Sequence, residues 1–267
     1  MFKALWKPAI LGLVQGLTEF LPVSSTAHIH LSARLLGLQS PGMVLDTSLH
    51  LGTLLATLAW LAGELASDPS LLQLPVLAKV ALATLPAGLA GLLLHDWIER
   101  HLRGPRLSAL MLMLGGGFLG LATRRQQQEA SARPLSALSY RAALGLGLAQ
   151  MLALMPGLSR SGMTLAAGLL AGLSHRDSLR FSFLMSLPVV AGSGLLKLRT
   201  LRQELRTPAL WQTLAIGSAS AALSGYLVLG QSLQRLQSQA TEVLSLYRIF
   251  LGAGLLWQAR GGGSKNG

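Results

Sequence analysis

The chain has 267 residues, of which 51% are hydrophobic and only 12% are charged, a balance that excludes an ordinary soluble domain and predicts a polytopic membrane protein. The net charge of +12 comes from basic residues in loops that flank apolar runs, which favours contact with anionic lipid headgroups over nucleic acid. The absence of cysteine excludes a disulfide framework, a thiolate metal site and a thiol nucleophile.

The first half of the chain, residues 1–123, reads as a broken helix followed by full-length spans. The length of the whole chain suits roughly eight to ten short helical segments at ~20 residues per span. We expect a re-entrant helical hairpin at 5–38 and spans at 43–62, 71–94 and 107–122. No small-residue cleavage site follows Lys3 and Lys7, so we expect no cleavable signal peptide.

The hairpin contains the first of two breaks in apolar sequence, LGLVQGLTEFLPVSSTAH, which begins at Leu11. Gln15 and Glu19 are four residues apart and share a helix face. Pro22 ends that helix. An ionisable side chain and a helix break at membrane depth are tolerated mainly where they line a cavity, so this stretch predicts a polar site.

A hydroxyl cluster follows the proline and is suited to start a new helix. Serine and threonine are good N-caps, and we expect the next apolar segment to begin near His28. The cluster consists of Ser24, Ser25 and Thr26. The first break thus combines hydroxyls, a carboxylate and an imidazole.

The second half repeats the plan after a polar inter-repeat loop at 124–139. In residues 140–258 we expect a second re-entrant hairpin at 140–173 and spans at 179–198, 208–230 and 243–257. Residues 259–267 are expected to be a flexible tail without function. Three true spans in each half place the two halves in opposite orientations, so we predict an all-α fold of two inverted-topology repeats.

An internal duplication supports this plan. The second break, LGLAQMLALMPGLSRSGMT from Leu146, aligns with the first, with a one-residue gap before the proline. Gln150 matches Gln15, an offset of 150 − 15 = 135 residues, and LAGL at Leu170 echoes LLGL at Leu35 at the same offset. Paired broken helices in two repeats indicate a binding site near the bilayer midplane.

The second break has the chemistry of an anion site. Pro156 and Gly157 end one helix, and Ser159 or Ser161 can cap the next. A helix N-terminus offers free N–H groups and partial positive charge, which suit phosphate. Arg160 adds a planar, permanently charged fork. If the first break faces it, the hydroxyls there supply further donors, and the pocket suits a pyrophosphate.

The first break adds groups that can carry out a reaction. Cleavage of a phosphoanhydride needs charge neutralisation, an activated nucleophile and a proton for the leaving group. Ser25, His28 or a water molecule is the nucleophile, and these alternatives stay open. Glu19 either orients His28 or holds a divalent cation, with Gln15 as a second oxygen ligand.

These motifs resemble the two signature regions of the bacterial undecaprenyl-diphosphatase family, the BacA/UppP family linked to bacitracin resistance. QGLTEFLPVSSTAH resembles the family's E/Q-x-x-x-E element with its hydroxyl–histidine turn, and PGLSRSGMT matches its P-G-x-S-R-S-x-x-T element. Lesser similarities are LHLGTLLA from Leu49, FSFLMSLP from Phe181 and YRIF from Tyr247. The resemblance covers nearly the whole chain except the tail.

The resemblance implies hydrolysis of undecaprenyl diphosphate to undecaprenyl phosphate and phosphate, which recycles the lipid carrier of envelope polymers. It also implies a multi-pass protein of the bacterial inner membrane, a pocket open to the periplasmic side, and a divalent cation such as Mg²⁺ or Ca²⁺. A homodimer is one assembly that we keep open. Gln15 stands where many relatives have glutamate, which leaves one carboxylate in the first motif.

The expected site residues fall into three groups. The catalytic group is Glu19, His28 and Ser25; the phosphate-binding group is Arg160, Ser159, Ser161, Thr164, Ser24 and Thr26; the metal ligands are Glu19 and Gln15. The family's functional positions cover Glu19, Ser25, His28, Arg160, Ser159 and Thr164 by resemblance, and the other positions come from the predicted pocket.

Two other functions are compatible with the same sequence. Inverted repeats with broken helices are also typical of transporters, so a flippase for an anionic polyprenyl phosphate lipid is the main alternative. A structural membrane subunit is the other. Glu19 and His28 favour the enzyme, because translocation alone needs the arginine but no acid–base pair. His30, His95, His101 and His175 have no companions at metal-ligand spacing.

Overall fold

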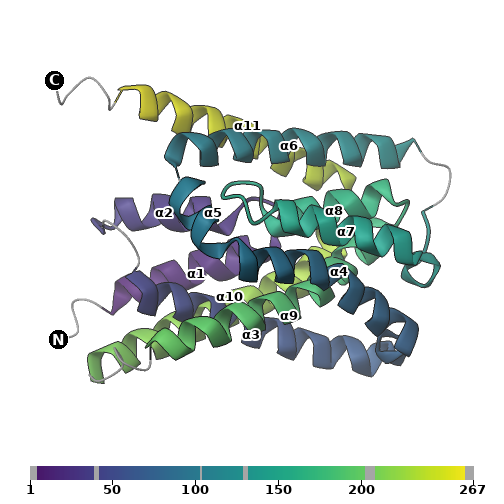
Figure 1. Ribbon diagram of the computed structural model, residues 1–267, viewed down its shortest axis with the longest axis horizontal. Coiled ribbons are helices and arrows are strands. Elements are labelled where there is room, and N and C mark those ends of the chain that lie inside the picture. The colour runs from purple at the N-terminus through teal and green to yellow at the C-terminus, as the bar shows by residue number, and fades with distance from the viewer. Residues whose placement is uncertain (1–4, 39–41, 103, 129–131, 202–207, 262–267) are drawn as a thin grey trace. The chain divides into compact units, whose positions relative to one another are not determined.

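The computed structural model describes residues 5–38, 42–102, 104–128, 132–201 and 208–261 (Figure 1). These residues form helices and turns, and their one pairing of strand type is an isolated bridge between Arg133 and Leu173. The predicted all-α fold class is therefore confirmed.

The described residues form α-helices joined by short connections. In chain order they are α1 Trp6–Phe20, α2 Ser25–Leu35, α3 Gly42–Ser67, α4 Leu74–Leu93, α5 His95–His101, α6 Pro105–Gln127, α7 Tyr140–Leu152, α8 Arg160–Leu170, α9 His175–Leu201, α10 Pro208–Arg235 and α11 Ser238–Gly261, with short 3-10 turns η2 Pro69–Leu72 and η3 Leu135–Ala137. Each predicted hairpin is a pair of short helices, α1 with α2 and α7 with α8. Pro86 lies inside α4.

Five of the described helices are long and apolar enough to cross a membrane. They are α3, α4, α6, α10 and α11, which correspond to five of the six predicted spans. The sixth predicted span, 179–198, lies in α9, whose first turns carry Arg176, Asp177 and Arg180; it stays a prediction. Residues 259–261 of the predicted tail belong to α11, and 262–267 lie outside the described residues.

The chain divides into two compact units, and each takes helices from both halves of the sequence. Unit 1 contains α1, α2, α3, η2, α9 from Phe183 onward and α10 up to Ser232. Unit 2 contains α4, α5, α6, η3, α7, α8, the start of α9 and α11. The predicted halves describe the duplication in the sequence, whereas the compact units follow the packing of helices.

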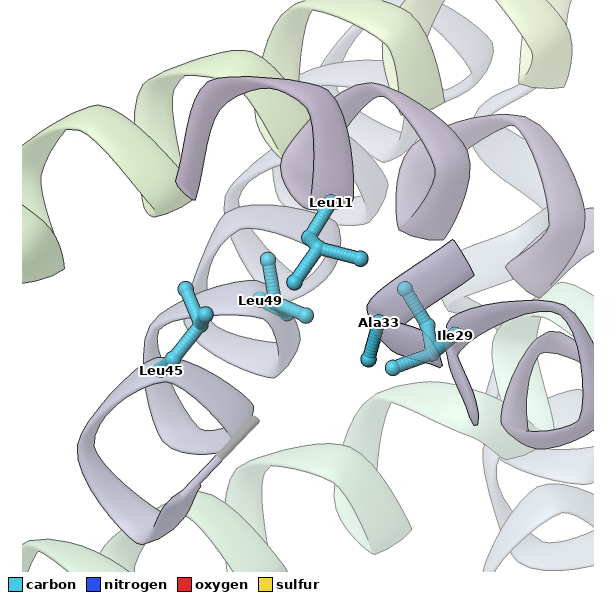
Figure 2. Close-up of a cluster of buried hydrophobic side chains, with 5 residues drawn as sticks. All are labelled: Leu11, Ile29, Ala33, Leu45 and Leu49. Carbon is cyan, nitrogen blue, oxygen red and sulfur yellow. The ribbon is translucent and has the colours of Figure 1, made fainter. Parts of the chain in front are cut away.

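In unit 1, the broken pair packs on α3 through aliphatic side chains. Leu11 of α1, Ile29 and Ala33 of α2, and Leu45 and Leu49 of α3 form one cluster (Figure 2). All five side chains are buried. The cluster fixes both arms of the first break to one long helix.

An aromatic stack in unit 1 holds the end of α1. The ring of Phe20 meets that of Phe183 edge-on at 5.7 Å, and Phe183 meets Trp60 edge-on at 5.4 Å. Edge-to-face pairs add stabilisation beyond burial. Phe20 is the last residue of α1, so this stack positions the residue from which the first break departs.

Equivalent glycines let the leading helix of each break approach another helix closely. A Cβ at Gly12 of α1 would lie 2.7 Å from the carbonyl oxygen of Gly217 in α10. A Cβ at Gly147 of α7 would lie 2.5 Å from the carbonyl oxygen of Ala83 in α4. The two glycines are 147 − 12 = 135 residues apart, the offset of the predicted duplication. Small residues permit such close approach of helices in membranes.

The same offset recurs in the backbone of the two breaks. Both α2 and α8 have 11 residues, and they begin 160 − 25 = 135 residues apart. Ser24 and Ser159, each one residue before its helix, have φ of 74° and 64°. Gly37 and Gly172, each two residues after its helix, have φ of 68° and 81°. The inverted orientation of the repeats stays a prediction.

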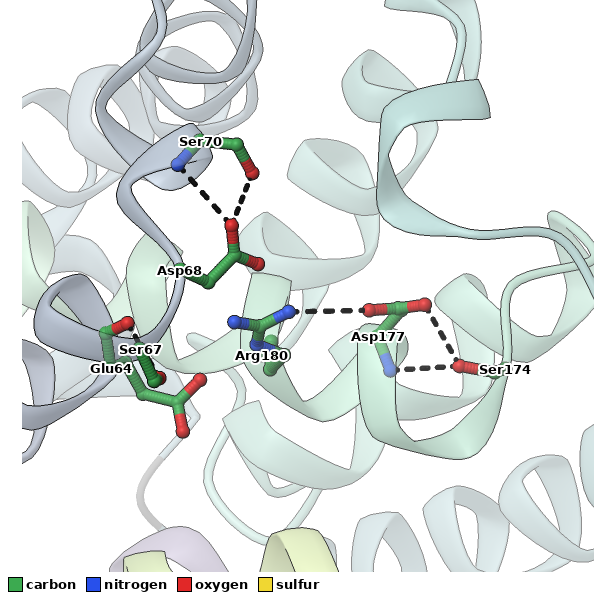
Figure 3. Close-up of polar contacts among 7 residues, drawn as sticks. All are labelled: Glu64, Ser67, Asp68, Ser70, Ser174, Asp177 and Arg180. Atoms are coloured by element: carbon green, nitrogen blue, oxygen red, sulfur yellow. Dashed lines mark hydrogen bonds and ion pairs between the residues drawn. The ribbon is translucent and has the colours of Figure 1, made fainter.

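Polar contacts close helix ends within each unit (Figure 3). In unit 2, the Ser174 hydroxyl accepts from the backbone N–H of Asp177 and donates to its carboxylate, both at 3.0 Å, and Arg180 lies 3.8 Å from the same carboxylate. In unit 1, Asp68 accepts from the backbone N–H of Ser70. Carboxylates near helix N-termini are favourable there.

The packing of α7 on α4 predicts a contrast between two glycines of α7. Gly147→Ala forces its methyl group into the backbone of α4, which costs about 1–3 kcal/mol and lowers the thermal unfolding midpoint by roughly 2–10 °C. Gly145→Ala is the matched control, because nothing lies within 4 Å of a Cβ there. It leaves the midpoint unchanged or raised, since alanine favours helix. Equal midpoints for both variants in detergent would contradict this packing.

Candidate functional site

The first break begins where α1 loses its helical backbone. Leu21 is extended, with φ −72° and ψ 145°, because the residue before a proline is disfavoured in the helical region. Pro22 itself has no N–H to continue the helix. Ser24, with φ 74°, then turns the chain into α2. The new helix starts at Ser25, three residues before the position expected from the sequence.

A carboxylate and a hydroxyl meet across this turn. The Ser25 hydroxyl donates to Glu19 Oε2 at 2.7 Å. Gln15 Nε2 donates to the same oxygen at 3.1 Å, as expected for two side chains four apart on a helix. The serine proton therefore points at a carboxylate that is oriented by a third group, which is the geometry of an activated nucleophile with its base.

The other predicted residues of the first break lie around this pair. His28 is half-buried and comes three residues after Ser25, so the two lie on one face of α2. Ser24 is 3% exposed, and its unusual φ belongs to the turn. Thr26 is exposed. In unit 1 the structure thus brings Gln15, Glu19 and Ser25 into direct hydrogen-bond contact.

The second break is capped as the sequence predicts. Ser159 is the N-cap of α8, and its hydroxyl accepts from the backbone N–H of Gly162 at 3.2 Å. The Ser159 and Ser161 hydroxyls lie 3.3 Å apart. Gly157 has φ 102°, and a Cβ there would collide with the carbonyl oxygen of Ser108 in α6. Glycine is required at this position for both reasons.

Arg160 opens α8 and is tied to the start of α9. Its Nη1 donates to the carbonyl oxygen of Ser182 at 3.3 Å. The Thr164 hydroxyl donates to the carbonyl oxygen of Arg160 at 2.8 Å and lies 2.6 Å from the Ser182 hydroxyl. Thr164 is 0% exposed. Its hydroxyl is therefore engaged with the backbone of Arg160 and with Ser182.

Sequence reasoning missed one residue at this break. Arg248, in the middle of α11, is 0% exposed. Its Nη2 donates to the carbonyl oxygen of Leu158 at 2.6 Å and lies 3.4 Å from that of Gly157. The available signal was an arginine inside an apolar span, which by itself suggests function.

The two breaks share a backbone but carry opposite charges. The offset of 135 places Leu154 where the first break has Glu19, and Ser25 where the second has Arg160. In unit 1 the break therefore presents a carboxylate with a hydroxyl. In unit 2 it presents arginine and serine at a helix N-terminus. The first arrangement suits proton transfer, and the second suits binding of an anion.

The site offers few oxygen ligands for a cation. Within the described ranges no group of three or more His, Cys, Asp or Glu side chains could hold a metal ion. Glu19 supplies one carboxylate and Gln15 an amide oxygen. Mg²⁺ is commonly bound by one or two carboxylates together with substrate phosphates. The residues therefore fit a cation that is shared with a diphosphate, rather than an all-protein cage.

Comparison with known proteins gives consistent matches. The family model described as Bacitracin resistance protein BacA matches residues 8–254. An undecaprenyl-diphosphatase of Colwellia psychrerythraea is 40% identical over 93% of this chain and 96% of its own length. Undecaprenyl-diphosphatases of Alcanivorax borkumensis and Thermomicrobium roseum are 38% and 40% identical, over 93% and 94% of this chain and 96% of each relative.

The contact between Thr164 and Ser182 predicts a stability difference. Thr164→Val leaves the buried Ser182 hydroxyl without this partner and lowers the free energy of unfolding by about 1–3 kcal/mol. Thr123→Val is the matched control, because that threonine is also 0% exposed but its hydroxyl donates only within its own helix, to the carbonyl oxygen of Leu119. Thermal unfolding in detergent compares them, and equal losses would contradict a supporting role for Thr164.

Proposed function

Because this chain belongs to the bacitracin resistance protein BacA family, we propose that it hydrolyses undecaprenyl diphosphate to undecaprenyl phosphate and inorganic phosphate. Three similar relatives carry the name undecaprenyl-diphosphatase. The product is the lipid carrier for peptidoglycan and other envelope polymers. Hydrolysis recycles that carrier and confers resistance to bacitracin.

The observation that carries this proposal is the hydrogen bond from the Ser25 hydroxyl to Glu19 Oε2 at 2.7 Å. A diphosphate needs a nucleophile at its terminal phosphorus and a group that takes the nucleophile's proton. A serine whose proton already points at a carboxylate meets both needs. A membrane protein that only bound or moved the lipid would have no use for this pair.

The proposed reaction has two steps. In the first, Ser25 Oγ attacks the terminal phosphorus, its proton passes to Glu19, and the bond from that phosphorus to the bridging oxygen breaks, so undecaprenyl phosphate leaves. In the second, water attacks the phosphoserine, inorganic phosphate leaves and the serine hydroxyl is restored. His28, on the same face of α2, donates the proton to the leaving phosphate and then activates the water. His28 is also the alternative nucleophile.

We propose that the second break binds phosphate groups. Arg160 supplies permanent positive charge, and the first turn of α8 supplies N–H groups and the hydroxyls of Ser159 and Ser161. The Thr164 hydroxyl supports Arg160 by donating to its backbone carbonyl oxygen. In the first break, Ser24 and Thr26 add donors. Donors and positive charge of this kind stabilise the negative charge of a phosphoryl group.

We further propose a divalent cation, Mg²⁺ or Ca²⁺, held by Glu19, Gln15 and the substrate's diphosphate. When bound, it neutralises phosphate charge. Gln15 lies 3.1 Å from Glu19 through its amide nitrogen, which leaves its amide oxygen for the cation. A single protein carboxylate predicts weak binding in the absence of substrate.

The apolar helices place the activity in a membrane. Five described helices meet the length and hydropathy of a span, so the protein is multi-pass, and the polyprenyl tail of the substrate stays in lipid. We propose the bacterial inner membrane, with the diphosphate reaching the site from the periplasmic side. The homodimer stays a prediction.

The alternative is a flippase for an anionic polyprenyl phosphate lipid. The two interrupted pairs, α1 with α2 and α7 with α8, favour it as a second candidate, because broken helices are typical of transporters. Detergent micelles separate the two functions, since they contain no second leaflet. Release of phosphate from a polyprenyl diphosphate in micelles is hydrolysis and cannot be transport.

Substitutions at the two breaks test the enzyme directly. Glu19→Gln and Arg160→Gln each lower the rate of phosphate release in micelles by about 100-fold or more, since one loses the base and the other the anion's charge partner. The matched controls are Glu64→Gln and Arg141→Gln, which change the same residue types outside the breaks. Turnover like that of wild type in both break variants would refute the function.

Removal of divalent cations gives a separate prediction. A chelator lowers the rate of phosphate release, and added Mg²⁺ or Ca²⁺ restores it, because the substrate's charge is otherwise uncompensated. The concentration of cation needed falls as substrate concentration rises, since the diphosphate supplies part of the coordination. A rate that is indifferent to both chelator and cation would remove the metal from the proposal while leaving the enzyme in place.

A further inference from the structure

A second arginine lies against the second break and has no role in the function as stated so far. Arg248 is 0% exposed inside the apolar helix α11. Its Nη2 donates to the carbonyl oxygen of Leu158 at 2.6 Å. Its Nε and Nη1 have no hydrogen-bond partner. No carboxylate among the described residues forms an ion pair with it. A buried guanidinium in this state is costly to folding.

Glycines in two neighbouring helices leave room for the Arg248 guanidinium. A Cβ at Gly115 of α6 would collide with Nη2, and one at Gly162 of α8 would lie 2.5 Å from Nη1. Gly162 belongs to the first turn of α8, where Ser159 caps its N–H. Nη1 is therefore directed at the positive end of a helix. The guanidinium and the positive end of α8 together favour binding of an anion. A core with only a structural role would not need both.

The first break has no such arginine. The offset of 135 places Met113 at the position equivalent to Arg248. Ser24, the equivalent of Ser159, adopts the same left-handed backbone, with φ 74° against 64°. Of these two equivalent sequence positions, only 248 carries an arginine.

We propose that Arg248 is a positioning residue of the anion site, an inference that rests on the proposed function. By holding the carbonyl oxygens of Gly157 and Leu158, it sets the turn from which Ser159 caps α8 and at which Arg160 begins the helix. The charge of Arg248, which has no carboxylate partner among the described residues, raises the positive potential at the first turn of α8. The diphosphate of the substrate is the anion that this potential attracts, and Arg248 acts on it through Arg160 and Ser159.

The first test replaces the arginine with its counterpart from the other half. Arg248→Met lowers kcat/KM for a polyprenyl diphosphate by about 100-fold, the loss expected when binding groups are displaced by a fraction of an ångström to an ångström. The loss is mainly in KM. The thermal midpoint without ligand stays equal to or above that of wild type, because a buried charge is replaced by an apolar chain of similar length. The stabilisation that inorganic pyrophosphate gives wild type is lost.

A second test moves the guanidinium and keeps its charge. Gly115→Ala pushes Nη2 away from Leu158 and lowers kcat/KM by about tenfold or more. Gly117→Ala on the same helix is the matched control, because nothing lies within 4 Å of a Cβ there. Its kinetics match wild type. Arg248→Lys, which keeps the charge and one donor, recovers part of the activity lost in Arg248→Met.

The outcomes separate this inference from the proposed function. Arg248→Met with wild-type kcat/KM and wild-type stabilisation by pyrophosphate would overturn the inference and leave the phosphatase intact. A variant that loses stability and activity in parallel without ligand would also overturn it, since that is a structural role. If wild type released no phosphate but lost its pyrophosphate response in Arg248→Met, the function would fail and the positioning role would stand.

Discussion

The structure depends on how a helix can stop and restart inside a bilayer. No water satisfies free backbone groups there, so a break is tolerated only where the chain itself supplies partners. Each break here contains a proline, a serine with positive φ and a new helix that begins at the next residue. Ser159 satisfies one such N–H, at Gly162. The groups left over at the helix N-terminus are those that suit phosphate.

The two breaks have matching backbone conformations but carry side chains of different chemistry. Ser25 and Arg160 each open an 11-residue helix after such a turn, but one is a nucleophile candidate and the other a charge partner. Glu19 has a leucine as its counterpart, and Arg248 has a methionine. The two breaks therefore differ in charge although their backbones correspond at one sequence offset.

The sequence predicted the all-α class, both broken pairs and an N-cap at Ser159 or Ser161, because proline, hydroxyl residues and apolar length act locally. It also predicted that Gln15 and Glu19 share a face. It could not predict that Ser25 reaches Glu19, because this depends on Ser24 taking φ 74°, nor that Arg248 meets Leu158, a contact between residues 90 apart. The sequence also could not predict which helices belong to each compact unit. This depends on contacts between distant helices, such as the close approach of Gly147 to Ala83.

The central claim is that Ser25, paired with Glu19, carries the transferred phosphoryl group. Rapid quenching of the enzyme during turnover of a terminally labelled polyprenyl diphosphate, followed by peptide mass spectrometry, measures this directly. Phosphoserine survives acid and phosphohistidine survives base, so parallel quenches distinguish Ser25 from His28. The account predicts acid-stable label on the peptide containing Ser25, with more of it in His28→Gln. Base-stable label on His28, or turnover with no labelled protein under either quench, would contradict it.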